Sequence, residues 1–153
     1  MKMMIAVKGS EEESFYGHAT ELTTLAEAEV ILLAHVIDLT PRSDLEHGRD
    51  RFLGKRPINP KRSEELQRVE DEHATAVLRF ARQALEKLDV PENRIQEVTV
   101  RGKPKDELQR LARELRINLV IVHGQAGKIG PHSVGKTARF LIDHCPQAAI
   151  LIR

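Results

Sequence analysis

The sequence contains one cysteine, no tryptophan and few aromatic residues, which make up 3% of its 153 positions. The single cysteine, Cys145, excludes an internal disulfide framework and a multi-cysteine metal site, and it is typical of a protein from a reducing compartment. So few aromatic rings leave little from which to build a base-stacking platform for nucleic acid. We therefore expect a cytoplasmic protein whose stability does not depend on disulfides.

Long hydrophobic runs and an excess of one charge sign are also absent. The longest apolar runs contain five residues each, at 3–7, 30–34 and 148–152. A transmembrane helix needs about 20 consecutive apolar residues, and the hydrophobic region of a signal peptide needs at least about 7. The 24 lysines and arginines balance 23 aspartates and glutamates, so the basic excess of a nucleic-acid or membrane-surface binder is missing. The composition predicts a soluble intracellular protein with no nucleic-acid or membrane partner.

Short β-rich runs alternate with longer segments of helical spacing. Strands are predicted at Met3–Val7, Glu29–Ile37, Ile95–Arg101, Leu119–His123 and Ala148–Ile152. Helices are predicted after Ser10 as an N-cap, after Ser63, from Pro104 and after Gly135. This alternation predicts one α/β domain over residues 1–153, an open five-stranded parallel sheet with helices on both faces.

The segment Thr40–Arg62 differs from the rest of the chain. It contains three of the seven prolines, two glycines, and seven basic residues against three acidic ones. A connection of this length is unusual in a compact domain and is usually functional or disordered. Two interpretations remain open, a solvated flexible basic insertion and a mobile basic lid over an anionic ligand.

A glycine-rich stretch directly follows the predicted strand Leu119–His123. Four of the nine glycines lie between Gly124 and Gly135, and a predicted helix comes next. Glycines allow the backbone to approach a ligand closely, and the start of a helix offers unpaired N–H groups and the positive end of its dipole. Strand, glycine-rich loop and helix is an arrangement that binds phosphate.

Residues 130–137 also match the phosphate-loop pattern G-x-x-x-x-G-K-[ST] letter for letter. In that interpretation Lys136 contacts phosphate and the Thr137 hydroxyl contacts magnesium. Gly130 lies well beyond the end of the strand, and the one strand that follows carries no terminal aspartate for the metal. A phosphoryl-transfer enzyme that uses Gly130–Thr137 is therefore an alternative rather than the leading hypothesis.

The same stretch resembles the universal stress protein family, whose loop before the last helix reads G-2x-G-9x-G-[ST]. Here Gly124 and Gly127 match the first half and Gly135 the later glycine. The opening Ile5–Ser10, followed by acidic residues, is similar to the family's opening, and Ala28–Asp38 is similar to its second strand. The resemblance implies the strand order 3-2-1-4-5 and a ligand at the switch point between the first and fourth strands, in the family's case ATP.

Three positions depart from the family pattern. Seven residues rather than nine separate Gly127 from Gly135, Lys136 stands in place of Ser or Thr, and Lys8 replaces an aspartate that the resemblance assigns to adenosine. The candidate ligand is ATP with Mg²⁺ or another phosphate compound. The candidate binding residues are Lys8, Gly9, Ser10, Val36, Gly124, Gly127, Gly130, Gly135, Lys136 and Thr137.

Other candidate sites are weaker. The seven histidines show no metal-ligand spacing, although His123 and His132 flank the glycine-rich loop, so no metal site is expected. A nucleophilic Ser10 or Ser133 needs a positioned base that the sequence does not supply. We expect Cys145 to be a packing residue and the run Glu11–Glu13 to be a first helical turn. The sequence therefore predicts a binding module, with at most slow incidental ATP hydrolysis.

The last strand, Ala148–Arg153, lies at a sheet edge in the order that the resemblance implies. An unprotected apolar edge favours pairing with a second copy. The resemblance points to a homodimer in which two such strands pair antiparallel. The leading hypothesis is a nucleotide-responsive stress protein, and the alternative within the same family is a member that acts through partner binding alone.

Overall fold

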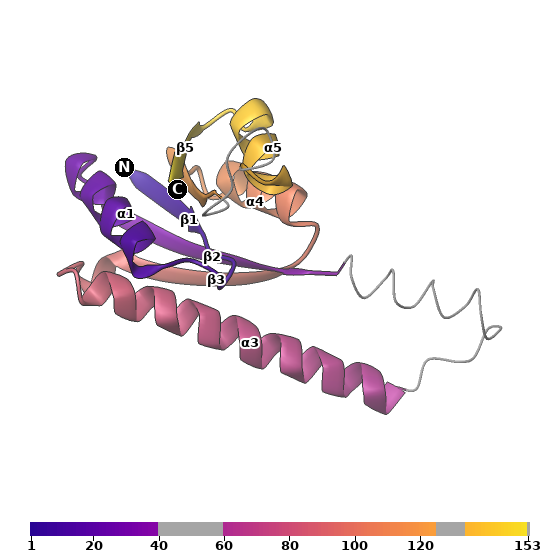
Figure 1. The fold of residues 1–153 in the computed structure, drawn as a ribbon. Helices are drawn as coiled ribbons and strands as arrows, with labels where there is room; N and C mark the ends of the chain where they lie inside the picture. Colours follow the sequence, from indigo (N-terminus) through magenta and orange to yellow (C-terminus); the bar gives the residue numbers. More distant parts are fainter. Residues whose placement is uncertain (40–59, 125–133, 153) are drawn as a thin grey trace.

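The computed structural model describes residues 1–39, 60–124 and 134–152. A five-stranded sheet forms the centre of the molecule (Figure 1), with the order β3-β2-β1-β4-β5 and parallel pairing throughout. The strands are β1 (Lys2–Ala6), β2 (Val30–Asp38), β3 (Ile95–Gly102), β4 (Leu119–His123) and β5 (Ala148–Ile152). The predicted fold class and strand order are confirmed, and each predicted strand end is within one residue of the observed one.

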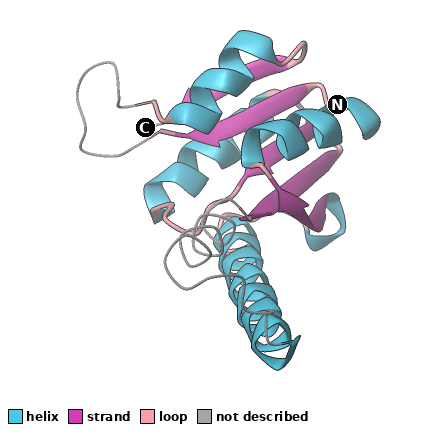
Figure 2. Ribbon diagram, turned by 90° about the vertical axis from the view of Figure 1, so that its right-hand side faces the viewer, coloured by secondary structure: helices cyan, strands magenta, loops and turns pink. Residues whose placement is uncertain are grey.

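Helices cover both faces of this sheet (Figure 2). Helices α1 and α3 pack on one face, and α4 and α5 pack on the other. Their bounds are α1 (Glu13–Leu25), α3 (Pro60–Glu86), α4 (Pro104–Glu114) and α5 (Lys136–His144), and a short 3₁₀ helix, η1 (Glu92–Arg94), precedes β3. Among these described helices, none is both long enough and apolar enough to cross a membrane.

The central strand β1 is buried on both sides. Met3 and Ile5 pack toward α1 and α3, whereas Met4 and Ala6 pack toward α4 and α5. Successive side chains of a strand point to opposite faces, so a run of five apolar residues supplies two cores at once. This is why the strand reads as a continuous apolar run rather than an alternating one.

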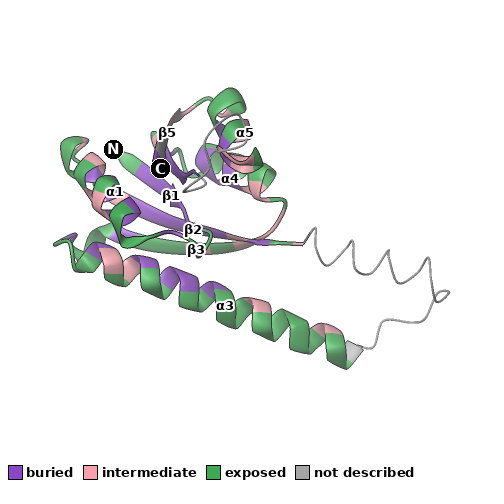
Figure 3. Ribbon diagram, in the orientation of Figure 1, coloured by how far each residue is buried: buried purple, intermediate pink, exposed green. Residues whose placement is uncertain are grey.

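Helix α3 extends beyond the sheet, and the exposed colouring of its first half in Figure 3 shows where it loses contact with the core. Its 27 residues correspond to a length of about 40 Å. Leu66 and Val69, which belong to the apolar spacing that predicts the helix, are 46% and 56% exposed. The helix begins at Pro60, so the predicted start after Ser63 and the predicted loop end at Arg62 are both wrong by a few residues.

The observed helix begins inside the predicted loop, at Pro60. Proline is favoured in the first turn of a helix, where its missing N–H leaves no hydrogen bond unmade, so a proline in a basic, glycine-containing stretch can start a helix as well as belong to a loop. The remainder of the predicted insertion, residues 40–59, lies outside the described residues.

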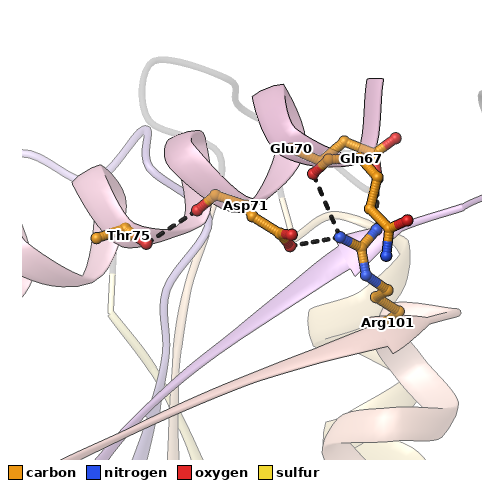
Figure 4. A network of polar contacts seen from close by, with 5 residues as sticks. All are labelled: Gln67, Glu70, Asp71, Thr75 and Arg101. Carbon is orange, nitrogen blue, oxygen red and sulfur yellow. Dashed lines mark hydrogen bonds and ion pairs between the residues drawn. The ribbon is translucent and has the colours of Figure 1, made fainter. Parts of the chain in front are cut away.

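Two arginines of β3 and α3 hold the long helix against the sheet. Near the end of β3, the Arg101 guanidinium donates to Glu70 (2.6 Å), to Asp71 and to the Gln67 carbonyl oxygen (3.5 Å), as Figure 4 shows. Near the start of the same strand, Arg82 of α3 donates to the Glu97 carboxylate. The helix is therefore fixed to the edge strand by ion pairs at both ends of that strand.

We expect Arg101→Ala to lower the free energy of unfolding by about 1 kcal/mol, because a half-buried network that joins two elements is worth more than an isolated surface pair. Arg110→Ala is the matched control, since Arg110 also pairs with two carboxylates, Glu107 and Glu114, but both are on its own helix. We expect the free energy of unfolding to fall less in Arg110→Ala than in Arg101→Ala. Urea unfolding of the two variants measures the difference, and equal losses would contradict the assigned role of Arg101.

Candidate functional site

The carboxyl ends of β1 and β4 lie side by side at the centre of the sheet. Ala6 pairs with Val122, so the turn after β1 and the residues after β4 start from neighbouring positions. The chain leaves β1 for α1 on one face and leaves β4 for α5 on the other. In open parallel sheets, ligands bind at such a switch point, outside the carboxyl ends of the strands.

The turn after β1 is organised by a carboxylate of the chain itself. The Glu11 side chain accepts hydrogen bonds from the backbone N–H groups of Lys8 (2.5 Å) and Gly9 (2.7 Å). Glu11 is only 7% exposed, whereas the Lys8 side chain is exposed. These two amides, which a ligand anion would otherwise meet, are therefore already satisfied.

The predicted start of the first helix differs from the observed one. Helix α1 begins at Glu13 with Glu12 as its N-cap, and no side chain caps it, so the predicted N-cap Ser10 is wrong. Of the acidic run Glu11–Glu13, only Glu13 lies in the first turn. Glu11 turns back toward the end of β1 and bonds to backbone N–H groups three and two positions earlier, with the left-handed Gly9 between them, and a run of three glutamates does not show which of them makes this local turn.

Gly9 has a structural reason to be glycine. Its φ is +100°, and a Cβ at this position would lie 2.7 Å from Cγ2 of Val77 in α3. The left-handed backbone and the close approach of α3 both favour a residue without a side chain. Gly9 therefore lets the turn pack closely against α3, and this reason for glycine does not depend on a ligand.

The start of α5 provides the anion-binding features that the glycine-rich loop predicted. Gly135 is the N-cap with a φ of +78°, no side chain caps the helix, and Lys136 is the first helical residue with an exposed side chain. Thr137 follows in the first turn, half-buried. Among the residues that the structure describes, no side chain caps the first amides of this helix, and such amides suit water or an anion.

The remaining predicted site residues are not gathered in one place. The Gly124 N–H donates to the Ile152 carbonyl oxygen (2.8 Å), so Gly124 ties β4 to β5. Val36 lies near the end of β2, half-buried against the α4 and α5 face. Gly127 and Gly130 lie outside the described residues, as do His132 and Ser133. Ser10 is exposed in the turn after β1.

Ring contacts connect the end of β4 with α3 through the buried Phe15 and Tyr16, and the last ring, Phe80, is exposed. His123 packs edge-on against Phe15 (centroids 5.0 Å apart), Phe15 against Tyr16 (5.2 Å), and Tyr16 against Phe80 (6.1 Å). His123 is thus a packing residue on the α1 face rather than an open ligand of the glycine-rich loop. No group of three His, Cys, Asp or Glu side chains suited to a metal ion occurs in the described parts of the chain.

Two further polar side chains, Tyr16 and His35, are buried near the turn after β1. The Tyr16 hydroxyl is buried and has no hydrogen-bond partner among the described residues. Burial, and secondarily the charge of Glu11, raises the pKa of Tyr16 well above its ordinary value. The buried His35 shares a hydrogen bond with the Val7 carbonyl oxygen (2.8 Å), in which Nδ1 donates because a carbonyl only accepts.

Cys145 lies at the end of α5, on the far side of the molecule from this turn. It packs against the core between the sheet and the α4 and α5 helices, and its thiol donates to Oε1 of Gln147 (2.9 Å). Its place as the helix C-cap, half-buried in an apolar cluster, agrees with the packing role predicted from the sequence.

Comparison with known proteins identifies the family. The sequence model of the universal stress protein family matches residues 1–153. The chain belongs to the universal stress protein family. No protein of curated function matches the sequence of this universal stress protein significantly.

Solved structures of this family share the fold at low sequence identity. The universal stress protein UspA from Lactobacillus plantarum has a TM-score of 0.68 at 19% identity, over 99% of this chain and 97% of that one. A universal stress protein from Archaeoglobus fulgidus in complex with dAMP has a TM-score of 0.66 at 15% identity, over 100% and 98% of the two chains. A universal stress protein family protein from Arabidopsis thaliana with AMP bound has a TM-score of 0.63 at 16% identity, over 99% of this chain and 90% of that one.

We expect Glu11→Gln to lower the free energy of unfolding by about 1–3 kcal/mol, because one of the two backbone N–H groups then faces an amide NH₂ instead of an oxygen. Glu12→Gln is the control, since Glu12 is exposed and its side chain makes no cap hydrogen bond. Urea unfolding followed by circular dichroism compares the two. A loss no larger in Glu11→Gln than in the control would refute the structural role of this carboxylate.

Tyr16 is the one tyrosine of the sequence, so tyrosinate absorbance reports on it alone. Because its folded-state pKa is raised, stability is fully present below the unfolded-state value of 10.0 and is lost as pH rises beyond it. We expect Tyr16 to ionise only together with alkaline unfolding, seen as coincident absorbance and circular dichroism transitions. Ionisation near pH 10 with the fold intact would contradict this, and Glu11→Gln should bring ionisation to lower pH.

Proposed function

We propose that this universal stress protein binds an adenine nucleotide at the switch point between β1 and β4. The observation that carries the proposal is the start of α5, which no side chain of the described residues caps and which lies at the same, carboxyl edge of the sheet as the turn after β1. Family members from Archaeoglobus fulgidus and Arabidopsis thaliana hold dAMP and AMP, which supports an adenine nucleotide as the ligand.

The turn after β1 and the start of α5 have different roles in this site. Because Glu11 occupies the N–H groups of Lys8 and Gly9, the turn after β1 has no free amide there for a phosphate. The phosphates therefore bind at the start of α5, where Lys136 adds a cation and Thr137 a hydroxyl that can reach Mg²⁺. The exposed Lys8 ammonium is available to the same anion from the β1 side.

We further propose that the protein acts as a cytoplasmic homodimer in a stress response, as a binding module without efficient turnover. Strand β5 pairs with β4 on one side, and no described strand pairs with its other edge. An open apolar edge favours pairing with a second copy through residues 148–153. Sedimentation velocity at micromolar concentration tests this arm, and a monomer there contradicts it.

Calorimetric titration of the nucleotide-stripped protein with ATP, with and without Mg²⁺, tests nucleotide binding. We expect micromolar binding that weakens about 10- to 150-fold in Lys136→Ala, the range for a hydrogen bond to a charged group. Lys87→Ala is the matched control, because Lys87 is also an exposed lysine but follows α3 at the amino edge of the sheet.

Each outcome selects one function. No binding at millimolar ATP by the folded protein overturns the proposal and favours a member that acts through partners alone, in keeping with Lys8 at the end of β1. Magnesium-dependent turnover abolished by Lys136→Ala favours the phosphoryl-transfer alternative. Equal losses in the Lys136 and Lys87 variants would mean that general electrostatics, not the start of α5, holds the phosphates.

A further inference from the structure

Helix α3 carries a line of apolar side chains that are exposed. Its first half projects beyond the sheet, as Figures 1 and 3 show. Leu66, Val69 and Phe80 are each about half exposed, and Ala76, between the last two in the chain, is exposed as well. Phe80 remains exposed although its ring contacts Tyr16 of α1. A single exposed apolar side chain is ordinary, whereas several on one face of a helix indicate an interaction surface.

The spacing of these side chains is that of a coiled-coil seam. Steps of three, four, three and four residues separate the positions of this seam, which are Leu66, Val69, His73, Ala76 and Phe80. Such steps correspond to positions a and d of a heptad and place the side chains on one stripe of the helix. All of them are exposed. His73 is the polar member, and a polar residue at a single a position can fix the register of a coiled coil.

The seam is separate from the face by which α3 packs on its own sheet. That face consists of the buried residues Ala74, Val77, Leu78, Ala81 and Leu85. A helix at the surface of one domain needs only one apolar stripe, and the sheet accounts for the buried one. The seam therefore indicates a second helix that packs on α3 from outside.

The charges beside the seam match a second copy of α3 that runs in the opposite direction. In an antiparallel pair, position a of one helix packs against position d of the other, and the g positions of the two helices face each other. With His73 packed against Ala76 of the second copy, Glu72 lies beside Arg79 of that copy. The two-fold symmetry repeats the contact, because Arg79 then lies beside Glu72 of the second copy. Two ion pairs thus flank the middle of the seam.

The charged groups near the middle of the seam permit this contact. Glu72 and Arg79 are both exposed, and the pair of Glu72 with Arg68 of the same helix (3.6 Å) lies in solvent. On the other side of the seam, the Glu70 carboxylate is already paired with Arg101 of β3 (2.6 Å). The approach of a second helix therefore brings no unbalanced like charges together at the middle of the seam.

A parallel pair of helices would not be matched in this way. In a parallel pair, a g residue faces the e residue of the next heptad in the partner, so Glu65 meets Glu70 and no oppositely charged pair forms. The antiparallel pair has one like-charge contact at each end of the seam, between Glu65 and Glu86, and there Arg82 already pairs with Glu86 (3.8 Å). The charge pattern favours the antiparallel arrangement.

We propose that α3 pairs antiparallel with α3 of a second copy of this protein, through the seam and the reciprocal contacts of Glu72 with Arg79. The projecting half of each helix then lies along the sheet-packed half of the other, which gives the extension of α3 beyond the sheet a role. This interface is distinct from pairing through β5, since α3 packs over β2 and β3 and β5 is the opposite edge strand. It requires no nucleotide.

Sedimentation velocity of charge-reversed variants over a range of concentrations tests the proposal. We expect Glu72→Arg alone and Arg79→Glu alone each to weaken association at least about tenfold, because each variant puts like charges at both contacts. An equimolar mixture of the two variants should regain association, since opposite charges meet again at both contacts of the mixed pair. Glu64→Arg is the matched control, because Glu64 is an exposed glutamate of the same helix outside the seam and its flanking positions.

The variant Val69→Glu tests the apolar part of the seam. Val69 is exposed, so the variant should keep the native circular dichroism spectrum while its association weakens at least about tenfold. Ile142→Glu is the matched control, since Ile142 is an exposed apolar residue of α5. Equal weakening in the two variants would overturn the role of the seam.

Recovery on mixing separates this interface from the one proposed at β5. Pairing through β5 contributes equally to every charge-reversed sample, so it cannot produce a loss that mixing restores. The proposal is overturned by association that neither charge reversal weakens, by equal weakening in Glu64→Arg, or by a mixture that associates no better than the single variants. Monomers at every concentration also overturn it, and they would mean that another segment of the chain or a different protein covers the seam.

Discussion

Burial of β1 on both faces is the constraint from which the architecture follows. The five residues of β1 are nearly all apolar. Such a strand pairs its backbone N–H and C=O groups only between two other strands and buries its side chains only between two layers of helices. Strands β2 and β4 pair with its backbone, and α1 with α3 and α4 with α5 form the two helical layers. Because the chain leaves β1 and β4 toward opposite faces, their carboxyl ends form the switch point of the sheet, and ligands of open parallel sheets bind at such a point.

Parallel pairing also gives the molecule two electrically different edges. Every helix that connects parallel strands begins at the carboxyl edge and ends at the amino edge, so helix starts with unpaired N–H groups gather on one side and unpaired carbonyls on the other. At the carboxyl edge the Glu11 carboxylate accepts from the N–H groups of the turn before α1, and no side chain of the described residues caps the start of α5. At the amino edge the last turns of α1 and α3 hold no basic residue, and Lys87 directly follows α3.

The sequence predicted the strands well because β1, β2, β4 and β5 are mainly apolar runs and β3 alternates apolar with polar residues, and β4 and β5 have the predicted bounds. It predicted the uncapped start of α5 because glycine marks that position. The turn after β1 was missed: Glu11 lies in an acidic run that reads as the first turn of a helix, but its carboxylate bonds to the N–H groups of Lys8 and Gly9 instead. The left-handed helix ends at Glu27 and Asp89 were missed as well, because glycine is the usual signal for such an end and neither position is glycine.

The three left-handed helix ends also bear on how this sequence tolerates change. At Glu27, Asp89 and Arg116 a side chain occupies a backbone conformation that costs about 1 kcal/mol more than it would cost glycine. Together these positions amount to roughly 3 kcal/mol in a fold of ordinary stability, about 5–15 kcal/mol. A glycine substitution at one of these helix ends can therefore restore stability that a core substitution elsewhere removes, without any repacking of the core. Arg116 follows α4 at the amino edge of the sheet, so glycine there would relieve the backbone without changing the proposed nucleotide site at the opposite edge.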